Sequence, residues 1–295
     1  MKSRIFSRLV LLVAVAVAAA SLITTGVNYK FLLPTTPPPA HASLPRSPAS
    51  YVGVYERGVQ SSYRPVTEFA KVAGQQPNLV GYYSGWSEPF HRSFAERVHA
   101  HGAVPFVQID PTDAFVSKIA TGKYDLYLRT YADSVRDFGH AVVIGFGHEM
   151  NAPRYPWGYG HVRPVVFIAA WRHIVTVFHD EGADNVTWVG IDGYYYNPTD
   201  TFATVFGQTI SHVRILTDKP ILLSETAVGP SPRQFAEIGD LFQGMRRYKT
   251  LGLVWFDIAQ DDGILHQNWR VERNSSVGTA FRLGISALTL ARPPR

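Results

Sequence analysis

Two glutamates lie in sequence contexts that suit acid–base and nucleophilic chemistry. Glu149 belongs to the stretch His-Glu-Met-Asn at 148–151, and a Tyr-Pro-Trp run follows at 155–157. Glu225 directly follows the mainly apolar run 221–224. Two carboxyl groups can hydrolyse a glycosidic bond when the protonated one donates to the leaving oxygen and the ionised one attacks the anomeric carbon. A gap of about 5–5.5 Å between them gives retention, and a wider gap gives inversion.

Aromatic and further polar side chains accompany these glutamates near the ends of apolar runs. Aromatic rings stack on the C–H face of a sugar, and polar groups bind its hydroxyls. The residues that we expect to bind substrate are His148, Tyr194, Trp86, Trp157, Trp255 and Asp257. Each has a simpler alternative, because tryptophan is often a core residue and a lone acid at a strand end is most often solvated or paired.

Short apolar runs alternate with helical patterns along most of the chain. The runs are 51–54, 79–83, 104–109, 142–146, 186–191, 221–224 and 253–256. Between several of them, as at 124–138, 167–178 and 235–245, apolar residues recur at spacings of three and four, which is typical of helices. Strand–helix alternation predicts an α/β fold with a parallel sheet, and at this length a (β/α)8 TIM-type barrel. Chemistry in such barrels lies at the carboxyl ends of the strands.

Four stretches together resemble glycoside hydrolase family 26. The stretch 148–158, His-Glu-Met-Asn-Ala-Pro-Arg-Tyr-Pro-Trp-Gly, resembles the acid/base motif of the family, and 219–226, Lys-Pro-Ile-Leu-Leu-Ser-Glu-Thr, resembles its nucleophile strand. The segments 190–194 and 253–257 resemble the strands that carry an active-site tyrosine and a subsite tryptophan. The matches spread from residue 51 to about 283. The chain is therefore similar to secreted, actinobacterial-like members of a family of endo-β-1,4-mannanases, mixed-linkage glucanases and β-1,3-xylanases.

The resemblance implies a role for each matching residue. Glu149 would be the acid/base and Glu225 the nucleophile of a retaining mechanism through a covalent glycosyl-enzyme. His148 would lie beside the acid and help to bind the sugar, and Tyr194 would hydrogen-bond the nucleophile. The rings expected beneath the sugar at the cleavage subsite and along a neighbouring subsite are Trp255 and Trp157 respectively.

The chain departs from the family pattern between Trp188 and Val189. Relatives usually have a loop, a helix and another strand there, whereas the two runs are directly joined here. One β/α element is therefore expected to be shortened or missing, so that the barrel closes with fewer strands or the chain is a truncated relative. Ala152 in place of a common Gly, and Arg154 in place of a common Trp, weaken the mannan assignment more than the family assignment.

The function that we expect is that of a retaining, endo-acting β-glycoside hydrolase that needs no cofactor or metal. The expected activity is that of a mannan endo-1,4-β-mannosidase, because mannanases dominate the family. Two alternatives stay open: a mixed-linkage β-glucanase or other β-glycanase of the family, and a catalytically impaired cell-surface protein that binds carbohydrate. A β-linked polysaccharide is the expected partner in each case, and the protein is expected to be a monomer.

Composition excludes several other classes of protein. The absence of cysteine excludes a disulfide scaffold, an iron–sulfur cluster and a cysteine-based zinc site. The net charge of +5 is misleading, because four of the 28 basic residues lie before residue 42, where there is no acidic residue. The rest of the chain is nearly neutral, which argues against nucleic acid as a partner. The sequence also contains no HExxH zinc motif and no phosphate-binding glycine loop.

The N-terminal region is expected to direct export. Residues 1–30 combine a basic start with an uncharged apolar run, which is typical of a signal peptide or a signal anchor. The proline-rich stretch 31–49 is predicted to be a linker, and 50–290 to be the catalytic barrel. We therefore expect a protein that is secreted or anchored to the outer face of the cell membrane.

Overall fold

The computed structural model describes residues 44–183, 188–260 and 267–292. The expected signal segment and most of the expected linker lie outside these residues, as do the first two residues of the predicted strand 186–191. No helix among the described residues is long and apolar enough to cross a membrane.

All strands of the described chain pair in parallel in one sheet of seven strands, in the order β4-β3-β2-β1-β7-β6-β5. The strands are β1 (Tyr51–Tyr55), β2 (Leu79–Gly85), β3 (Val104–Asp110), β4 (Val143–Phe146), β5 (Val189–Tyr195), β6 (Ile221–Val228) and β7 (Gly252–Phe256). Each predicted run overlaps one of them, although β5 and β6 each continue four residues beyond the runs at 186–191 and 221–224.

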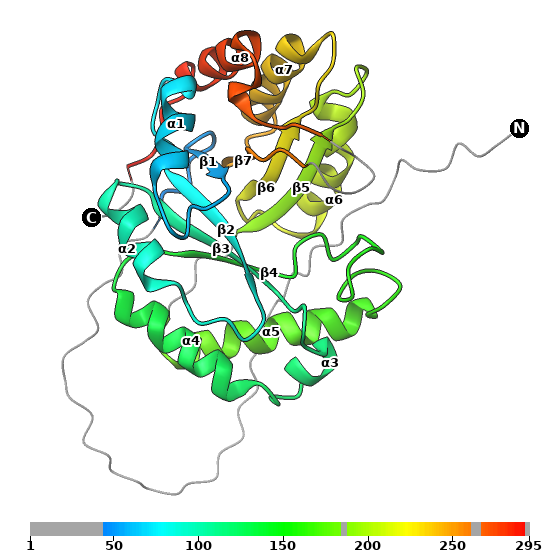
Figure 1. Cartoon of the computed structure of the whole chain (residues 1–295). Coiled ribbons are helices and arrows are strands. Elements are labelled where there is room, and N and C mark those ends of the chain that lie inside the picture. Colours follow the sequence, from blue (N-terminus) through cyan, green and yellow to red (C-terminus); the bar gives the residue numbers. More distant parts are fainter. Residues whose placement is uncertain (1–43, 184–187, 261–266, 293–295) are drawn as a thin grey trace, which may run out of the picture.

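Helices lie around the outside of the curled sheet, with α7 and α8 on one side and α4 and α5 on the opposite side (Figure 1). They are α1 (Arg64–Ala73), α2 (Arg92–Ala100), α3 (Val116–Ile119), α4 (Asp125–Phe138), α5 (Pro164–Asp180), α6 (Gln208–Leu216), α7 (Gln234–Arg247) and α8 (Ser275–Ser286). A π-helical turn, η1 (Ala203–Gly207), precedes α6, and a 3-10 turn, η2 (Val271–Arg273), precedes α8.

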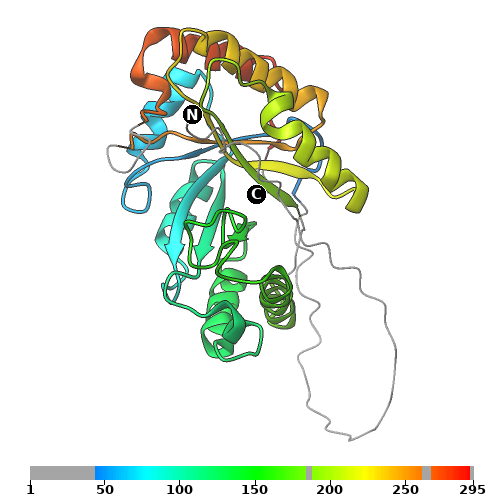
Figure 2. The same cartoon turned by 90° about the vertical axis from the view of Figure 1, so that its right-hand side faces the viewer.

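The sheet has the strand order of a (β/α)8 barrel that lacks one element. In the turned view the sheet curls between its two edge strands, β4 and β5 (Figure 2). Among the described residues no strand pairs with the outer edge of either one. The expectation of a TIM-type α/β fold with a missing element before Val189 is therefore confirmed, and the described strands form an open half-barrel rather than a barrel closed with fewer strands.

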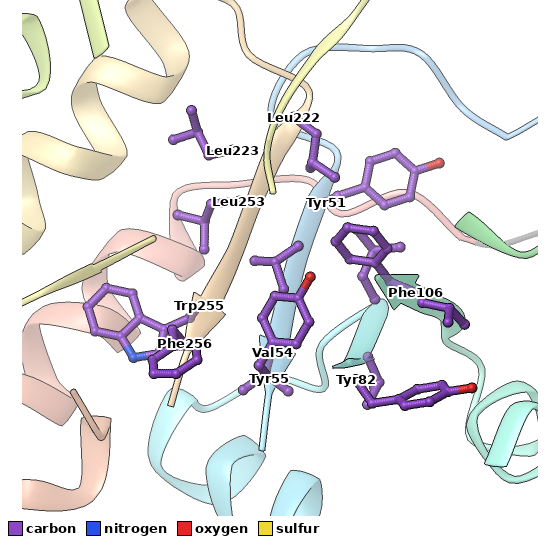
Figure 3. Close-up of a cluster of buried hydrophobic side chains, with 14 of the residues drawn as sticks. Tyr51, Val54, Tyr55, Tyr82, Phe106, Leu222, Leu223, Leu253, Trp255 and Phe256 are labelled. Atoms are coloured by element: carbon purple, nitrogen blue, oxygen red, sulfur yellow. The ribbon is translucent and has the colours of Figure 1, made fainter. Parts of the chain in front are cut away.

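Aromatic residues fill the concave side of the sheet. The ring of Tyr55 stacks on that of Tyr83 at 4.9 Å between centroids and lies 5.7 Å from that of Phe106. Gly81 makes room for this layer, since a Cβ atom there would lie 2.3 Å from the Tyr55 ring. Figure 3 shows Tyr55 and Phe106 in the core cluster. These side chains form a packed floor beneath the carboxyl ends of the strands.

A bulge interrupts β6 near its middle. Leu223 pairs with Ile191 of β5, but Glu225 pairs with the next residue, Asp192, so Ser224 is the extra residue. The register against β7 shifts over the same positions. Side chains alternate between the faces of a regular strand, and one extra residue reverses that alternation. The bulge therefore lets Ser224 and Glu225 both face the concave side.

Candidate active site

Glu225 lies at the centre of a tyrosine cluster on the concave side of the sheet. Its carboxylate accepts hydrogen bonds from the hydroxyls of Tyr194 on β5 and Tyr83 on β2. The side chain is buried, and burial raises the pKa of Glu225 to about 8. The two phenol donors act in the opposite direction, because a hydrogen bond to a carboxylate favours its ionised form. The expected contact between Tyr194 and Glu225 is thus present.

Tyr194 is held as a proton donor by its surroundings. Burial raises the pKa of Tyr194 well above its usual range, and the negative charges of Asp192 and Glu149 raise it further. Asp192 accepts a hydrogen bond from the Ser224 hydroxyl at 2.6 Å. Burial raises the pKa of Asp192 to about 6, although the hydrogen bond from Ser224 lowers it. Asp192 and Glu225, which pair across β5 and β6 at the bulge, therefore both have raised pKa values.

His148 follows β4 and is fixed through both ring nitrogens. Nδ1 lies 2.7 Å from Oδ1 of Asp110, and Nε2 lies 2.9 Å from the hydroxyl of Tyr155. Burial lowers the pKa of His148, but the hydrogen bond and the charge of Asp110 outweigh burial and hold it above its usual value. The ring of His148 lies 5.1 Å from that of Tyr83, which links it to the Glu225 cluster.

Glu149 has an unusual backbone. Its φ of +47° is in the left-handed region, where residues other than glycine are uncommon and strained. Its side chain is 17% exposed and forms an ion pair with Arg154, whose guanidinium lies 4.8 Å from the Tyr155 ring. Such backbone strain tends to occur at functional sites.

The two glutamates border the same group of side chains. Tyr194 donates a hydrogen bond to Glu225, and the charge of Glu149 raises the pKa of the same tyrosine. The charge of Glu149 also acts on Asp192, which is the β5 partner of Glu225. Both carboxyl groups, together with His148, therefore belong to one network at the carboxyl-terminal half of the sheet.

Three expected sugar-binding residues lie elsewhere, and this corrects the sequence analysis. Trp255 has no exposed surface, packs edge-on against Phe281 of α8, and donates its Nε1 hydrogen to the carbonyl of Trp269 (Figure 3). Trp86 is buried against Tyr124 and Tyr127. A buried ring offers no face to a sugar, so both are core residues.

Asp257 also points away from the network. It is buried, and its Oδ1 accepts a hydrogen bond from the backbone N–H of Val271 at 2.7 Å. Its neighbour Phe256 lies on the concave side, with its ring 6.0 Å from that of Tyr194. Asp257 therefore fixes the segment before α8, which is the simpler alternative.

Trp157 supports the site from behind. Its ring is buried and stacks on Tyr155 at 4.7 Å between centroids. Its Nε1 hydrogen bonds to the carbonyl of His148 at 2.8 Å. Trp157 therefore positions the loop that carries His148 and Glu149. Because it is only 3% exposed, it does not line a neighbouring sugar subsite, and that prediction is corrected too.

Three aromatic residues of the site were missed. Tyr83 donates to Glu225, and Trp269 lies 4.8 Å from the Tyr194 ring. Tyr196 is 42% exposed and lies near Glu149, whose charge raises its pKa, and Arg154, whose charge lowers it. The alternation in β2, where Gly81 and Tyr83 share a face, could have indicated Tyr83. Nothing in the sequence distinguishes Trp269 from a core tryptophan.

Solved mannanase structures have the same fold. A family 26 β-mannanase from Bacteroides ovatus superposes with a TM-score of 0.63 and 14% identity, covering 84% of this chain and 91% of that one. Mannanase man26 from Bacillus subtilis gives a TM-score of 0.59 and 17% identity over 83% of this chain and 87% of that one. The chain has the fold of the family 26 mannanases. The family resemblance of the motifs is thus supported by the whole architecture.

One curated relative was found by sequence. Endoglucanase H of Acetivibrio thermocellus is 25% identical over 279 residues, a match that includes 78% of this chain. The match spans only 30% of the length of that relative. No protein-family model matches the chain.

Proposed function

We propose that the protein is a retaining, endo-acting β-glycoside hydrolase, with Glu225 as nucleophile and Glu149 as acid/base. The observation that carries the proposal is that both glutamates interact with Tyr194. The hydroxyl of Tyr194 donates to Glu225, which also accepts from Tyr83, and the charge of Glu149 raises the pKa of Tyr194. Two carboxyl groups, one on β6 and one on the loop after β4, are the groups that glycoside hydrolysis needs. The mannanase fold supports the same conclusion.

The chemistry proceeds in two steps. An ionised Glu225 oxygen attacks the anomeric carbon while the carboxylic acid of Glu149 donates its proton to the leaving oxygen. Water then attacks the glycosyl-enzyme, Glu149 takes the proton of that water, and Glu225 leaves as a carboxylate. Tyr194 and Tyr83 hold the attacking carboxylate in one orientation through their hydroxyls. No residue that the mechanism uses requires a cofactor.

Mannan is the substrate that we propose first, because the similar solved structures are mannanases. Mixed-linkage β-glucan is the second, because the curated relative is named an endoglucanase. The half-exposed ring of Tyr196, rather than Trp255, is the proposed stacking surface. Export, with the N-terminal segment cleaved or kept as a membrane anchor, and a monomeric state complete the proposal.

The test uses Glu149→Gln and Glu225→Gln, with Glu96→Gln as the matched control. Glu96 is exposed and forms a surface ion pair with Arg92. Reducing-sugar release from mannan, galactomannan and barley glucan is expected to fall roughly 10³-fold or more in the first two variants and to stay unchanged in the third. Proton NMR of the first-formed anomer then tests retention. Full activity in either active-site variant would refute the assigned roles.

One observation favours the impaired, carbohydrate-binding alternative. The guanidinium of Arg154 binds the carboxyl group that would have to protonate the leaving oxygen. If this pair suppresses turnover, the native protein will bind polysaccharide without cleaving it, and Arg154→Gln will restore cleavage. Measurable turnover by the native protein excludes this alternative.

A further inference from the structure

A second group of carboxylates lies apart from the proposed active site. One carboxylate oxygen from each of Glu56, Asp257 and Glu272 lies within 4.8 Å of the other two. Glu56 directly follows β1, Asp257 directly follows β7, and Glu272 is the central residue of η2. Three acids from three elements, far apart in sequence, thus converge at one point.

The backbone around this group is fixed. Tyr55 pairs with Phe256 at the ends of β1 and β7, and the N–H of Asp257 donates to the carbonyl of Tyr55 at 3.0 Å. This pairing places Glu56 beside Asp257. The hydrogen bond from the N–H of Val271 to Oδ1 of Asp257 then holds η2, and with it Glu272, against the same strand ends.

One oxygen of the group has no donor outside the group. Oδ2 of Asp257 is buried in a residue that is only 1% exposed, and no N–H group or hydroxyl of the described residues donates to it; only a proton shared with Glu56 or Glu272 reaches it. Its other oxygen is taken by Val271, so Oδ2 is the atom that Asp257 can offer to a ligand. Burying a carboxylate oxygen without a partner costs free energy, and coordination of a cation would remove that cost.

Nearby cations do not neutralise the group. Arg57 donates to the carbonyl of Ala259 at 2.9 Å, and none of the ion pairs formed by the described residues includes the three acids. Arg270 lies near enough for its charge to act on Glu56. The three acids therefore have no paired basic side chain among the described residues.

We propose that Glu56, Asp257 and Glu272 bind a calcium ion that ties the ends of β1 and β7 to the segment before α8. All the available donors are oxygens, which suit hard cations. Calcium accepts six to eight oxygen ligands in irregular geometry, whereas magnesium demands near-ideal octahedral geometry. The exposure of Glu272 leaves space for water ligands on the open side. The role is structural, since Asp257 points away from the Glu225 network.

The test measures calcium binding directly, so it is independent of any hydrolase activity. The full chain is stripped with EDTA, dialysed, and titrated with CaCl2 by calorimetry, and its thermal unfolding is followed. Terbium luminescence sensitised by nearby tryptophans, reversed by Ca²⁺, provides a second readout. We expect one calcium per chain and a rise in Tm of roughly 5–10 °C at a 100-fold excess over Kd.

Two variants localise the site. Glu272→Gln changes an exposed residue and should fold, whereas Asp257→Asn tests the buried ligand. Both are expected to weaken calcium binding at least tenfold, and Glu96→Gln, which alters an exposed acid elsewhere, is expected to leave it unchanged. Absence of calcium binding at millimolar concentrations, or undiminished binding in Glu272→Gln, would overturn the proposal. An equal response to Mg²⁺ would overturn the choice of calcium.

Discussion

At the scale of single residues, Glu225 combines burial with two hydrogen-bond donors. Burial raises its pKa to about 8, because it destabilises the ionised carboxylate. The hydrogen bonds from Tyr194 and Tyr83 reduce this destabilisation. A nucleophile must be ionised, and hence activity should increase as pH rises through the pKa of Glu225. The tyrosines are therefore expected to set the lower pH limit of the proposed activity.

Tyr194→Phe removes one donor and keeps the ring. The pKa of Glu225 should rise, because its carboxylate loses a stabilising hydrogen bond. We expect the acidic limb of the pH profile of kcat/KM to move by about one unit to higher pH. Steady-state kinetics between pH 5 and 10 measure this shift. If the acidic limb stays at the same pH while the rate falls equally at every pH, Tyr194 contributes packing and does not set the pKa of Glu225.

Glu225→Gln should stabilise the fold at alkaline pH. A carboxyl group whose pKa is raised in the folded state contributes stability below its unfolded pKa, and this contribution is lost as pH rises toward about 8. The free energy of unfolding of the native protein should therefore fall by up to about 1.4 kcal/mol per pH unit between about pH 4.5 and 8. The variant should lack this slope. Urea unfolding of both proteins at pH 5 and pH 8 measures the difference, and equal slopes would contradict the assignment of a raised pKa.

At the scale of elements, close contact between β1 and β2 supports the site. Gly81 leaves room for Tyr55, which stacks on Tyr83, and Tyr83 donates to Glu225. A substitution at Gly81 of β2 can thus shift the carboxylate of Glu225 through the rings of Tyr55 and Tyr83.

Gly81→Ala should therefore damage stability and activity together. Its Cβ atom would lie 2.3 Å from the Tyr55 ring, and overpacking of this kind costs about 1–3 kcal/mol. Gly239→Ala is the matched control, because a Cβ atom there meets nothing within 4 Å and alanine favours the helix by up to about 1 kcal/mol. Thermal unfolding and kcat/KM of both variants test the contrast. A Gly81→Ala protein with native Tm and activity would show that the ring of Tyr55 can shift to make room for the added methyl group.

The elements were easier to predict than the direction of their side chains. Apolar runs located every strand, but all five residues of β7 are buried on one face or the other. Such a strand has no polar alternation to show which face is concave. Trp255 was assigned to the sugar site through motif resemblance, and the pattern of the strand could not show that Phe256 is the inward residue. Glu149, His148 and Tyr194 were identified through motif resemblance rather than through periodicity.

At the scale of the whole molecule, the sheet has two edges where a closed barrel has none. β4 and β5 form these edges among the described strands, and all four residues of β4 are only partly buried. β1 and β7, at the centre of the sheet, are buried throughout. The loop that carries His148 and Glu149 therefore continues directly from a weakly covered edge.

Hydrogen exchange should reveal this difference in protection. Amides of β4 are expected to exchange faster than those of β1 and β7, because an edge strand is paired on one side and opens locally at lower free energy. Mass spectrometry of peptic peptides after deuterium labelling measures the rates. Equal protection of β4 and β1 would indicate that another segment covers this edge.

The bulge in β6 turns two consecutive side chains toward the concave side, where a regular strand would turn only one. Ser224 donates a hydrogen bond to Asp192 from the first of these positions, and Glu225 accepts from Tyr194 and Tyr83 at the second. In a regular strand of the same sequence, Glu225 would share a face with Leu223 and point toward the helices. A Ser-Glu-Thr signature alone therefore does not identify a nucleophile, because a strand with that signature in unbroken register would hold its glutamate on the wrong face.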